Sequence, residues 1–195
     1  DEPIVNSRHG DYSAIRESYL PDHFRRDWGV LNVVGSVHVE AEWDRSDPVG
    51  ETRWLHEVHA SHGFPSAVVA HARLDDEDID QVLASQNVFP LVRGVRDKPT
   101  TAAKAEEIVS GTPGSMSDPQ WRSGYAKLEE HGFSFDLQVP FWHMEEAAEL
   151  ASAFPRTLMI INHTGLPSVR DHDGLAAWRE AMGAVATVPN VVLKI

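Results

Sequence analysis

Short apolar segments alternate along the chain with segments in which apolar residues recur at helical spacing. Strands are predicted over residues 31–41, 66–74, 88–96, 133–139, 157–163 and 191–195. Helices are predicted between them, over residues 51–61, 76–84, 119–130, 144–153 and 174–186. Residues 99–114 are polar and irregular, which predicts a long loop. Asp118 and Pro119 form a typical helix start, because Asp caps a helix and Pro fits its first position.

Strands that are separated by helices need crossover connections, which predicts a parallel sheet and an α/β fold. Two architectures fit this order, a doubly wound open sheet and a (β/α)8 TIM barrel. No Gly-x-Gly-x-x-Gly run follows the first predicted strand, which disfavours the dinucleotide-binding form of the open sheet. We expect residues 1–195 to form a single domain.

The last residues, 191–195, are β-branched and apolar, so the chain stops inside a predicted strand. A complete barrel takes about 250 residues and eight strands, whereas only six strands are predicted here. We therefore expect a barrel truncated at both ends. The alternative is that residues 191–195 form a short edge strand that ends a complete small domain.

The composition of the chain argues against several classes of partner and of chemistry. The chain has 195 residues with 17 Lys and Arg against 30 Asp and Glu, a formal net charge of -13. This acid excess argues against nucleic acid and against an anionic membrane surface as partners. No apolar run is long enough to span a bilayer and no signal peptide is recognised, so a cytoplasmic location is expected. The chain has no Cys, which excludes disulfides and thiolate chemistry.

Polar and ionisable residues follow the predicted strands, where the active groups of parallel α/β folds lie. The candidates are His38, Glu40, Glu42, His71, Arg73, Arg93, Arg96, Asp136, Gln138, Asn162 and His163. The two-residue period of a strand predicts that His38, Glu40 and Glu42 share one face.

Each of these candidates could also have a purely structural role. His163 follows an apolar run and suits a general base or a metal ligand, because a buried imidazole needs a partner. Arg96 suits the binding of a carboxylate, and Glu40 suits acid–base chemistry or a ligand role. For Arg93 a functional role and a structural role are equally supported, whereas for His38 and His71 a structural role is favoured.

The remaining aromatic and histidine residues carry less information. Trp142 could stack on a substrate ring or serve as a packing residue. His56, His59 and His62 share a helix but lack the Glu of a His-Glu-x-x-His zinc site, so a solvated face is the better interpretation. The histidines in loops and at helix ends are expected at the surface: His9, His23, His131, His143 and His172.

Several runs occur together in a fixed order at barrel-strand intervals. They are Val37–Ala41 (VHVEA), Arg93–Arg96 (RGVR), Phe135–Leu137 (FDL), Ile161–Gly165 (INHTG) and Asn190–Ile195 (NVVLKI). The set resembles the amidohydrolase superfamily, and within it the branch of sugar-acid lactonases and 2-pyrone-4,6-dicarboxylate lactonase. The resemblance extends from about Tyr12 to Ile195.

The resemblance implies a (β/α)8 barrel, present here as roughly its second to seventh strands, that hydrolyses a lactone by water attack. By position, His163 matches a catalytic or metal-binding histidine, and Glu40 matches the glutamate of the second strand. Arg96 matches a substrate-binding arginine, and the substrate-binding candidates also include Arg93, His38, Gln138 and Trp142. The resemblance leaves open whether a divalent metal ion, Zn2+ or Mn2+, is required, with His163 as the candidate ligand.

The family's first-strand His-x-His pair and its last-strand Asp, the expected base, have no match in this chain. The expected partner is a small acidic or polyhydroxylated lactone. Assembly into a homo-oligomer stays open. Two other functions stay open: a metal-dependent decarboxylase of the same superfamily, and a non-catalytic or vestigial ligand-binding barrel.

Overall fold

A computed structural model describes residue 13 and residues 16–195 of the chain. The chain divides into two compact units, Asp1–Gly35 and Ser36–Ile195. The first unit contains helix α1 (Pro21–Trp28), in which Phe24 and Trp28 pack edge to face with 5.3 Å between their ring centroids. The hydrophobic pattern did not predict this helix.

The second unit is built on a parallel sheet of six strands in sequential order, β1 to β6. The strands are β1 (Val37–Val39), β2 (Ala67–His71), β3 (Val92–Asp97), β4 (Ser134–Leu137), β5 (Met159–Ile161) and β6 (Val191–Leu193). The helices are α2 (Gly50–His62), α3 (Ile79–Asn87), α4 (Pro119–His131), α5 (Met144–Ala153) and α6 (His172–Val185). Short 3-10 helices are η2 (Ala105–Glu107), η3 (Phe141–His143) and η4 (Asn162–Gly165).

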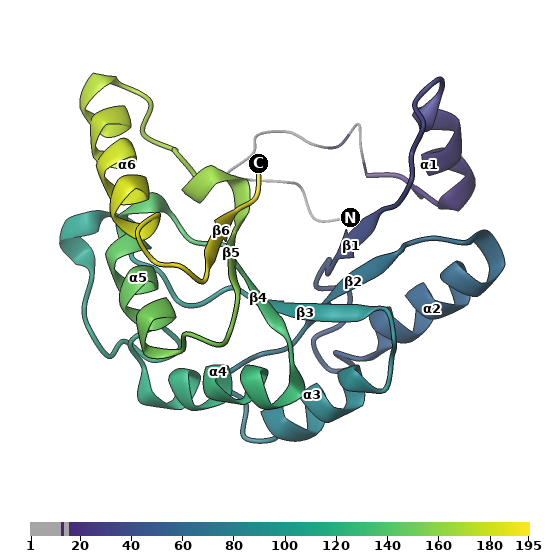
Figure 1. Cartoon of the computed structure of the whole chain (residues 1–195), viewed down its shortest axis with the longest axis horizontal. Coiled ribbons are helices and arrows are strands. Elements are labelled where there is room, and N and C mark those ends of the chain that lie inside the picture. Colours follow the sequence, from purple (N-terminus) through teal and green to yellow (C-terminus); the bar gives the residue numbers. More distant parts are fainter. Residues whose placement is uncertain (1–12, 14–15) are drawn as a thin grey trace. The chain divides into compact units, whose positions relative to one another are not determined.

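Helices and strands of this unit form two layers. The strands lie side by side in an inner arc, and α2 to α6 lie outside it (Figure 1). Sequential strand order with a helix after each strand is the arrangement of a (β/α) barrel, in which each crossover leads to the neighbouring strand. The doubly wound alternative predicts a reversal of strand order, which the sheet does not contain.

The predicted strands and helices all occur in the predicted order, but several strands are shorter than predicted. The first is reduced from residues 31–41 to Val37–Val39, with one further ladder bond from Glu40 N to Val69 O at 2.9 Å. The fifth ends at Ile161, because His163 and Thr164 adopt left-handed backbone conformations that no strand can contain.

Helix α4 begins and ends where the sequence predicts. The side chain of Asp118 accepts a hydrogen bond from Gln120 N at 3.0 Å, and Pro119 occupies the first turn. Gly132 ends the helix with φ 70°, a left-handed conformation that favours glycine. Among the described residues, no helix combines the length and the apolar character that crossing a membrane requires.

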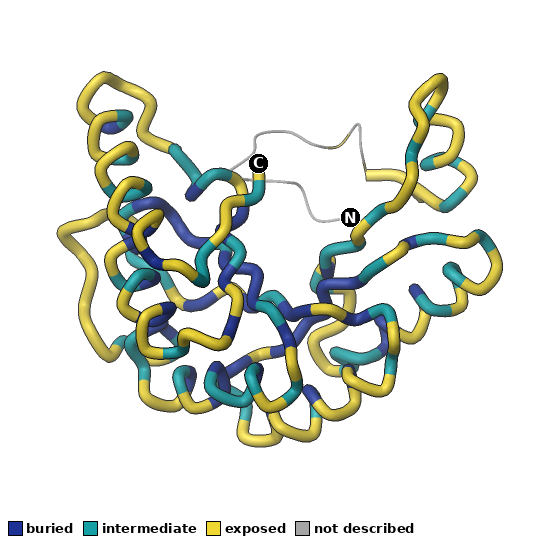
Figure 2. Tube along the Cα trace, viewed as in Figure 1, coloured by how far each residue is buried: buried dark blue, intermediate teal, exposed yellow. Residues whose placement is uncertain are grey.

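The core lies between the sheet and the helices. Phe135, Leu137 and Ile161 point from the strands into this layer and are almost completely buried. Buried residues therefore concentrate on the strands and on the inner sides of the helices, and exposed residues on the outer sides (Figure 2). Because strand side chains alternate, the residues between these apolar ones face the concave side of the sheet.

Helix α4 packs closely on the segment after β2 at Gly124. A Cβ atom at Gly124 would lie 1.9 Å from the carbonyl oxygen of Leu74, which is backbone and cannot move aside as a side chain can. Gly183 in α6 is the matched contrast, because a Cβ atom there would meet no described residue within 4 Å other than its own helix backbone and chain neighbours.

We expect Gly124→Ala to destabilise the protein by about 1–3 kcal/mol, since overpacking forces the backbone apart. Gly183→Ala is expected to be neutral or stabilising by about 0.5–1 kcal/mol, the gain of Ala over Gly in a helix. Urea unfolding of both variants measures the difference. Equal stability of the two variants would contradict the close packing of α4.

Candidate active site

Strand register places ionisable residues in one row on the concave face of the sheet. His71 of β2 pairs with Arg96 of β3, which pairs with Asp136 of β4. Asp136 in turn pairs with Ile160 of β5. Glu40, Asn162 and Lys194 lie just beyond the carboxyl ends of β1, β5 and β6. Each of the six strands thus contributes one polar residue to the end of the sheet where barrel enzymes carry their active sites.

The buried ion pair of Arg96 and Glu40 joins β3 to β1. Arg96 Nε donates to Glu40 Oε1 at 2.5 Å, and Arg96 Nη2 donates to the backbone oxygen of Glu40 at 2.6 Å. The Glu40 side chain is 2% exposed and that of Arg96 is 12% exposed. Glu40 Oε2 accepts a hydrogen bond from Glu42 N at 2.8 Å, so both carboxylate oxygens are engaged.

A second group of polar residues joins β4, β5 and β6. The amide of Asn162 donates to Asp136 Oδ2 at 2.9 Å and to the backbone oxygen of Ile160 at 3.0 Å. Lys194 Nζ also donates to Asp136 Oδ2. Asn162 Oδ1 lies 3.5 Å from Arg96 Nη1, which links this group to the Arg96–Glu40 pair. Asp136 and Asn162 are almost completely buried, so each depends on these partners.

His71 lies against the same pair. Its Nδ1 atom is 3.6 Å from Glu40 Oε2, and within the described part of the chain this buried nitrogen has no hydrogen-bond partner. The network therefore runs from His71 through Glu40, Arg96, Asn162 and Asp136 to Lys194 and contains two carboxylates and two fixed cations.

His163 lies beside this network on a strained turn. His163 and Thr164 have φ values of 51° and 52°, and Leu166 has 49°. Left-handed conformations of such residues cost about 1 kcal/mol or more each and collect at functional sites. The His163 side chain is exposed, so the prediction of a buried imidazole was wrong. Its catalytic or metal-binding role stays a prediction.

His38 and Glu40 do not share a face, which corrects the prediction from the two-residue period. His38 pairs in register with Val68, a core residue, and therefore faces the helix layer. There His38 Nε2 lies 2.7 Å from Glu51 Oε1 of α2. Burial alone would raise the pKa of Glu51, but the hydrogen bond with His38 lowers it. Regular alternation ends at Val39, which is why Glu40 turns inward.

Arg93 lies near the amino end of β3, at the other end of the strand from Asp97. Its side chain is exposed and donates to the backbone oxygens of Pro90 at 2.5 Å and Val92 at 3.0 Å. The structure therefore separates Arg93 from Arg96, although both belong to one predicted strand end.

Gln138 and Trp142 lie after β4 and outside the network. Gln138 is half-buried just beyond Leu137. Trp142 donates from Nε1 to the backbone oxygen of Ala102 at 3.1 Å, and its ring packs against Phe141. Trp142 thus fastens the long loop after β3, and its substrate-binding role stays a prediction.

His143 is buried, so the expectation that it lies at the surface was wrong. Its side chain is 3% exposed; Nε2 accepts from Ala102 N at 3.1 Å, and Nδ1 lies 3.0 Å from Glu146 Oε2. The position after a strand could not distinguish this role, because the partner Ala102 lies 41 residues away in the chain.

Lys194 is the residue of the network that the sequence interpretation left without a role. The signal was present: a single Lys interrupts the otherwise apolar run of residues 191–195. A charged residue in a predicted strand needs a buried partner, and Asp136 is that partner.

The described residues do not fit a complete metal centre. Within residues 13 and 16–195, no three His, Asp or Glu side chains are gathered in a way that could hold a metal ion. Both oxygens of Glu40 are already engaged by Arg96 and by Glu42 N. Glu40 is therefore not available as a metal ligand in this arrangement.

Comparison with known proteins identifies the family. Residues 3–195 match the family Amidohydro_2, described as amidohydrolase. The chain belongs to this amidohydrolase family. The resemblance drawn from the ordered strand-end runs is thereby confirmed, and so is the (β/α) barrel fold, of which the described residues form a part.

Two curated relatives are similar to this amidohydrolase. The uncharacterized protein y4mH of Sinorhizobium fredii is 36% identical over 98% of the chain and 64% of its own length. An L-fucono-1,5-lactonase of Burkholderia ambifaria is 28% identical over 74% of the chain and 47% of its own length. The amidohydrolase chain therefore spans about half to two thirds of these relatives.

A solved structure shares the fold. An amidohydrolase from Burkholderia multivorans with bound HEPES superposes with a TM-score of 0.74 and is 22% identical, over 92% of this chain and 60% of its own. Another crystal form of that protein contains bound zinc. At this level of identity the likeness shows the fold alone.

Loss of Arg96 is expected to destabilise the fold. Arg96→Met would leave the carboxylate of Glu40 buried without its cation, which costs about 3–5 kcal/mol. The control is Arg93→Met on the same strand, expected within about 0.5 kcal/mol of the parent because Arg93 is exposed. Chemical denaturation measures both. Adding Glu40→Gln to Arg96→Met should restore part of the stability, and no recovery would contradict the pairing.

Proposed function

We propose that this amidohydrolase opens a lactone ring, of a sugar acid or of the pyrone type, by attack of water. The observation that carries the proposal is the network of charged and polar residues, most of them buried, at the carboxyl ends of all six strands. Buried charges are costly and are kept at sites that bind or transform polar molecules. The similarity to an L-fucono-1,5-lactonase supports the choice of a cyclic ester.

Arg96 is the group that we assign to substrate orientation. A guanidinium has five N–H donors, and the named contacts of Arg96 use three of them. The remaining donors can bind a carbonyl or carboxylate oxygen of the substrate. Glu40 is assigned to positioning, because its carboxylate fixes the guanidinium plane from one side while Asn162 borders it on the other.

His163 is assigned to the reacting carbonyl. It follows β5 directly, and the strained turn holds it out from the sheet. In the reaction, water adds to the ring carbonyl carbon and the ring C–O bond breaks with a proton passing to the ring oxygen, giving a hydroxy acid that ionises at neutral pH to a hydroxy carboxylate and one proton. An imidazole can donate a hydrogen bond to the carbonyl oxygen as negative charge develops there. The base that activates water is, by the resemblance, the last-strand Asp that has no match among residues 1–195.

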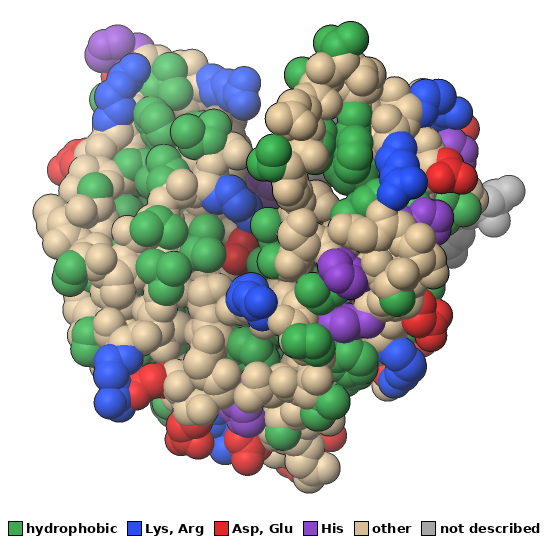
Figure 3. Space-filling model, turned by 45° about the vertical axis from the view of Figure 1, so that its right-hand side comes forward, with side chains coloured by type: hydrophobic (Ala, Val, Ile, Leu, Met, Phe, Trp, Pro, Cys, Tyr) green, Lys and Arg blue, Asp and Glu red, His purple; other side chains and the backbone are tan. Residues whose placement is uncertain are grey.

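Because the chain is strongly acidic, the binding of an anionic substrate would depend on cations within the site. The chain carries a formal charge of -13, which repels anions at long range. On the face drawn in Figure 3, Lys and Arg side chains of the described residues lie scattered among hydrophobic and polar ones. An anionic substrate would therefore depend on cations inside the site, namely Arg96 and Lys194.

The proposal is tested by offering the intact protein a panel of lactones. The panel contains L-fucono-1,5-lactone, other sugar-acid lactones and 2-pyrone-4,6-dicarboxylate, and proton release is followed in a pH-stat. We expect one proton for each ring opened and no release of CO2. Release of CO2 from an unsaturated acid would favour a decarboxylase, and no turnover of any lactone would contradict the proposal.

The role of a metal ion is decided by chelation of the same preparation. Loss of activity with a chelator and its return with Zn2+ or Mn2+ would give the metal-assisted form of the reaction. Unchanged activity would give the metal-independent form.

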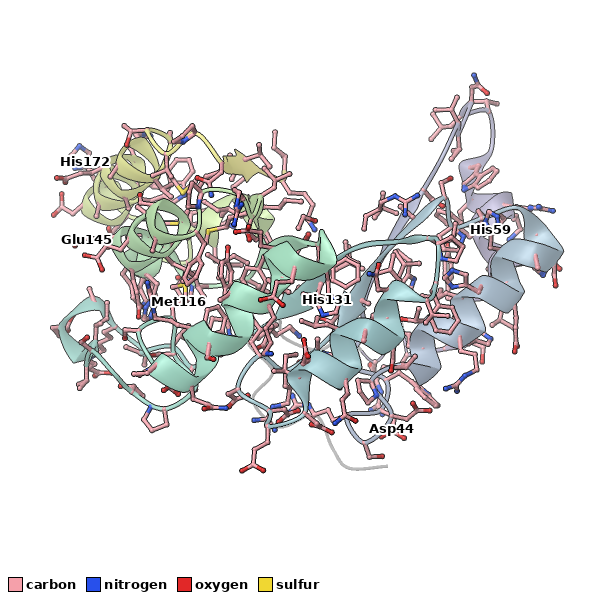
Figure 4. All side chains as sticks on the ribbon, turned by 60° about the horizontal axis from the view of Figure 1, so that its bottom comes forward. Asp44, His59, Met116, His131, Glu145 and His172 are labelled. Atoms are coloured by element: carbon pink, nitrogen blue, oxygen red, sulfur yellow. The ribbon has the colours of Figure 1, made fainter. Side chains whose placement is uncertain are left out.

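We expect His163→Asn to lower kcat by about 100-fold or more, the scale of a lost acid–base or hydrogen-bonding group in catalysis. Asn tolerates the left-handed backbone of this turn better than most residues, so the fold should be kept. The matched control is His131→Asn, since His131 lies at the end of α4 beside α3 and contacts Asp80 (Figure 4). Parent-like kcat in His163→Asn would refute the assignment.

A further inference from the structure

A polar cavity of about 340 Å³ opens among the segments that follow β1, β2 and β3, beside the network. Its lining residues are Glu42, Arg45, His71, Arg73, Asp75, Asp97, Lys98, Thr100, Gly114 and Trp121. The volume falls in the range of small-molecule sites. Only His71 of the central network lines this cavity, so the cavity adjoins the network rather than coinciding with it.

The charges that line the cavity are balanced. Glu42 contacts Lys98 at 3.1 Å and Arg45 at 3.3 Å, and Arg73 contacts Asp75 at 3.1 Å. Burial alone would raise the pKa of Glu42, but Lys98 and then Arg45 lower it overall, so this carboxylate is ionised at neutral pH. Each fixed cation of the lining therefore contacts a carboxylate, with Lys98 and Arg45 sharing Glu42. With Asp97 included, three carboxyl groups face three fixed cations, so the lining offers a dianion no large excess of positive charge.

Two lining residues are buried and have unused hydrogen-bonding capacity. His71 is 7% exposed, and its buried Nδ1 has no hydrogen-bond partner among the residues that the structure describes. Asp97 is 9% exposed; its Oδ2 accepts from Leu74 N at 3.0 Å and from Trp121 Nε1 at 2.9 Å. The carboxylate also accepts from the backbone N–H of Lys98. Because each carboxylate oxygen can accept more than one hydrogen bond, Asp97 keeps capacity for a ligand. Burial raises the pKa of Asp97.

We propose that this cavity binds the hydroxyl groups of a neutral, polyhydroxylated ring, with His71 and Asp97 as the residues that contact it directly. A hydroxyl group both donates and accepts, so it can use a carboxyl oxygen and an imidazole nitrogen together. Ion pairs line the remainder of the cavity and offer further hydrogen-bond donors and acceptors. The inference rests on the proposed lactonase function and selects a sugar-type ring over a planar dicarboxylate.

The arrangement divides the work between two parts of the site. Arg96 would bind the reacting carbonyl end of the ring, while His71 and Asp97 would form hydrogen bonds with its hydroxyl groups. His71 is joined to Glu40 by the 3.6 Å approach of Nδ1 and Oε2, so the cavity and the network share one boundary.

The test measures binding in the intact protein by isothermal titration calorimetry, which needs no turnover. The probes are L-fucose, as a neutral hydroxylated ring, and benzene-1,3-dicarboxylate, as a planar dianion. The variants are His71→Leu and Asp97→Asn. Leu keeps much of the volume and removes both nitrogens. Asn keeps an oxygen for the Leu74 and Trp121 donors and replaces the other oxygen with an NH2 group.

We expect L-fucose to bind saturably and more tightly than the dianion, and each variant to weaken it about tenfold, the scale of one lost hydrogen bond to a charged or buried group. The Tm of His71→Leu should fall little, since Nδ1 lies 3.6 Å from Glu40 Oε2 and makes no hydrogen bond with any described residue. The controls are His131→Leu and Asp80→Asn, a contacting pair outside the cavity, and both should bind L-fucose like the parent.

The outcomes separate this inference from the proposed function. Binding of L-fucose that both variants weaken, in a protein that hydrolyses no lactone, would uphold the cavity and refute the lactonase. Lactone hydrolysis with L-fucose affinity unchanged in both variants would refute the cavity and leave the lactonase. Failure of the parent to bind L-fucose, or preference for the dicarboxylate, would also refute the cavity assignment.

Discussion

The buried pair of Arg96 and Glu40 is the interaction on which the candidate site depends. A carboxylate that is 2% exposed is tolerable only with a cation and further hydrogen bonds, and Arg96 supplies three N–H donors to its surroundings. These contacts require β1, β3 and β5 to meet at their carboxyl ends in one register. The sheet register therefore positions the Arg96–Glu40 pair, and the pair in turn stabilises that register.

Strand alternation explains how a stable core and a charged site coexist in such short strands. In β4, Phe135 and Leu137 enter the core, while Asp136 between them faces the concave side. Removing Asp136 from water is offset by Asn162 and Lys194, which arrive from the next two strands. Each polar residue is thus stabilised by neighbours in space that are distant in the chain, and a change at one position is felt by the others.

Rigid and strained parts of the site have different tasks. Arg96, Asp136 and His71 lie on strands, whose side-chain directions are set by the ladder, and such elements hold groups in place better than loops. His163 and most of the residues that line the cavity belong to segments that follow the strands, whereas His71 and Asp97 are the last residues of β2 and β3. Substrate recognition in barrels varies through such segments while the strands stay the same. This separation fits a chain whose family relatives carry a lactonase name but share limited identity with it.

The sequence by itself determined the order of strands and helices in Ser36–Ile195, the caps of α4 and the family, because these follow from local patterns and short motifs. It also indicated Arg96 and Glu40 as site residues. It misplaced His38, Arg93 and His143, whose neighbours Glu51, Pro90 and Ala102 are chosen by the end of regular strand geometry and by loop packing. Only the tertiary structure joined Lys194 to Asp136 and His71 to the cavity, since strand register brings together residues that no sequence spacing relates.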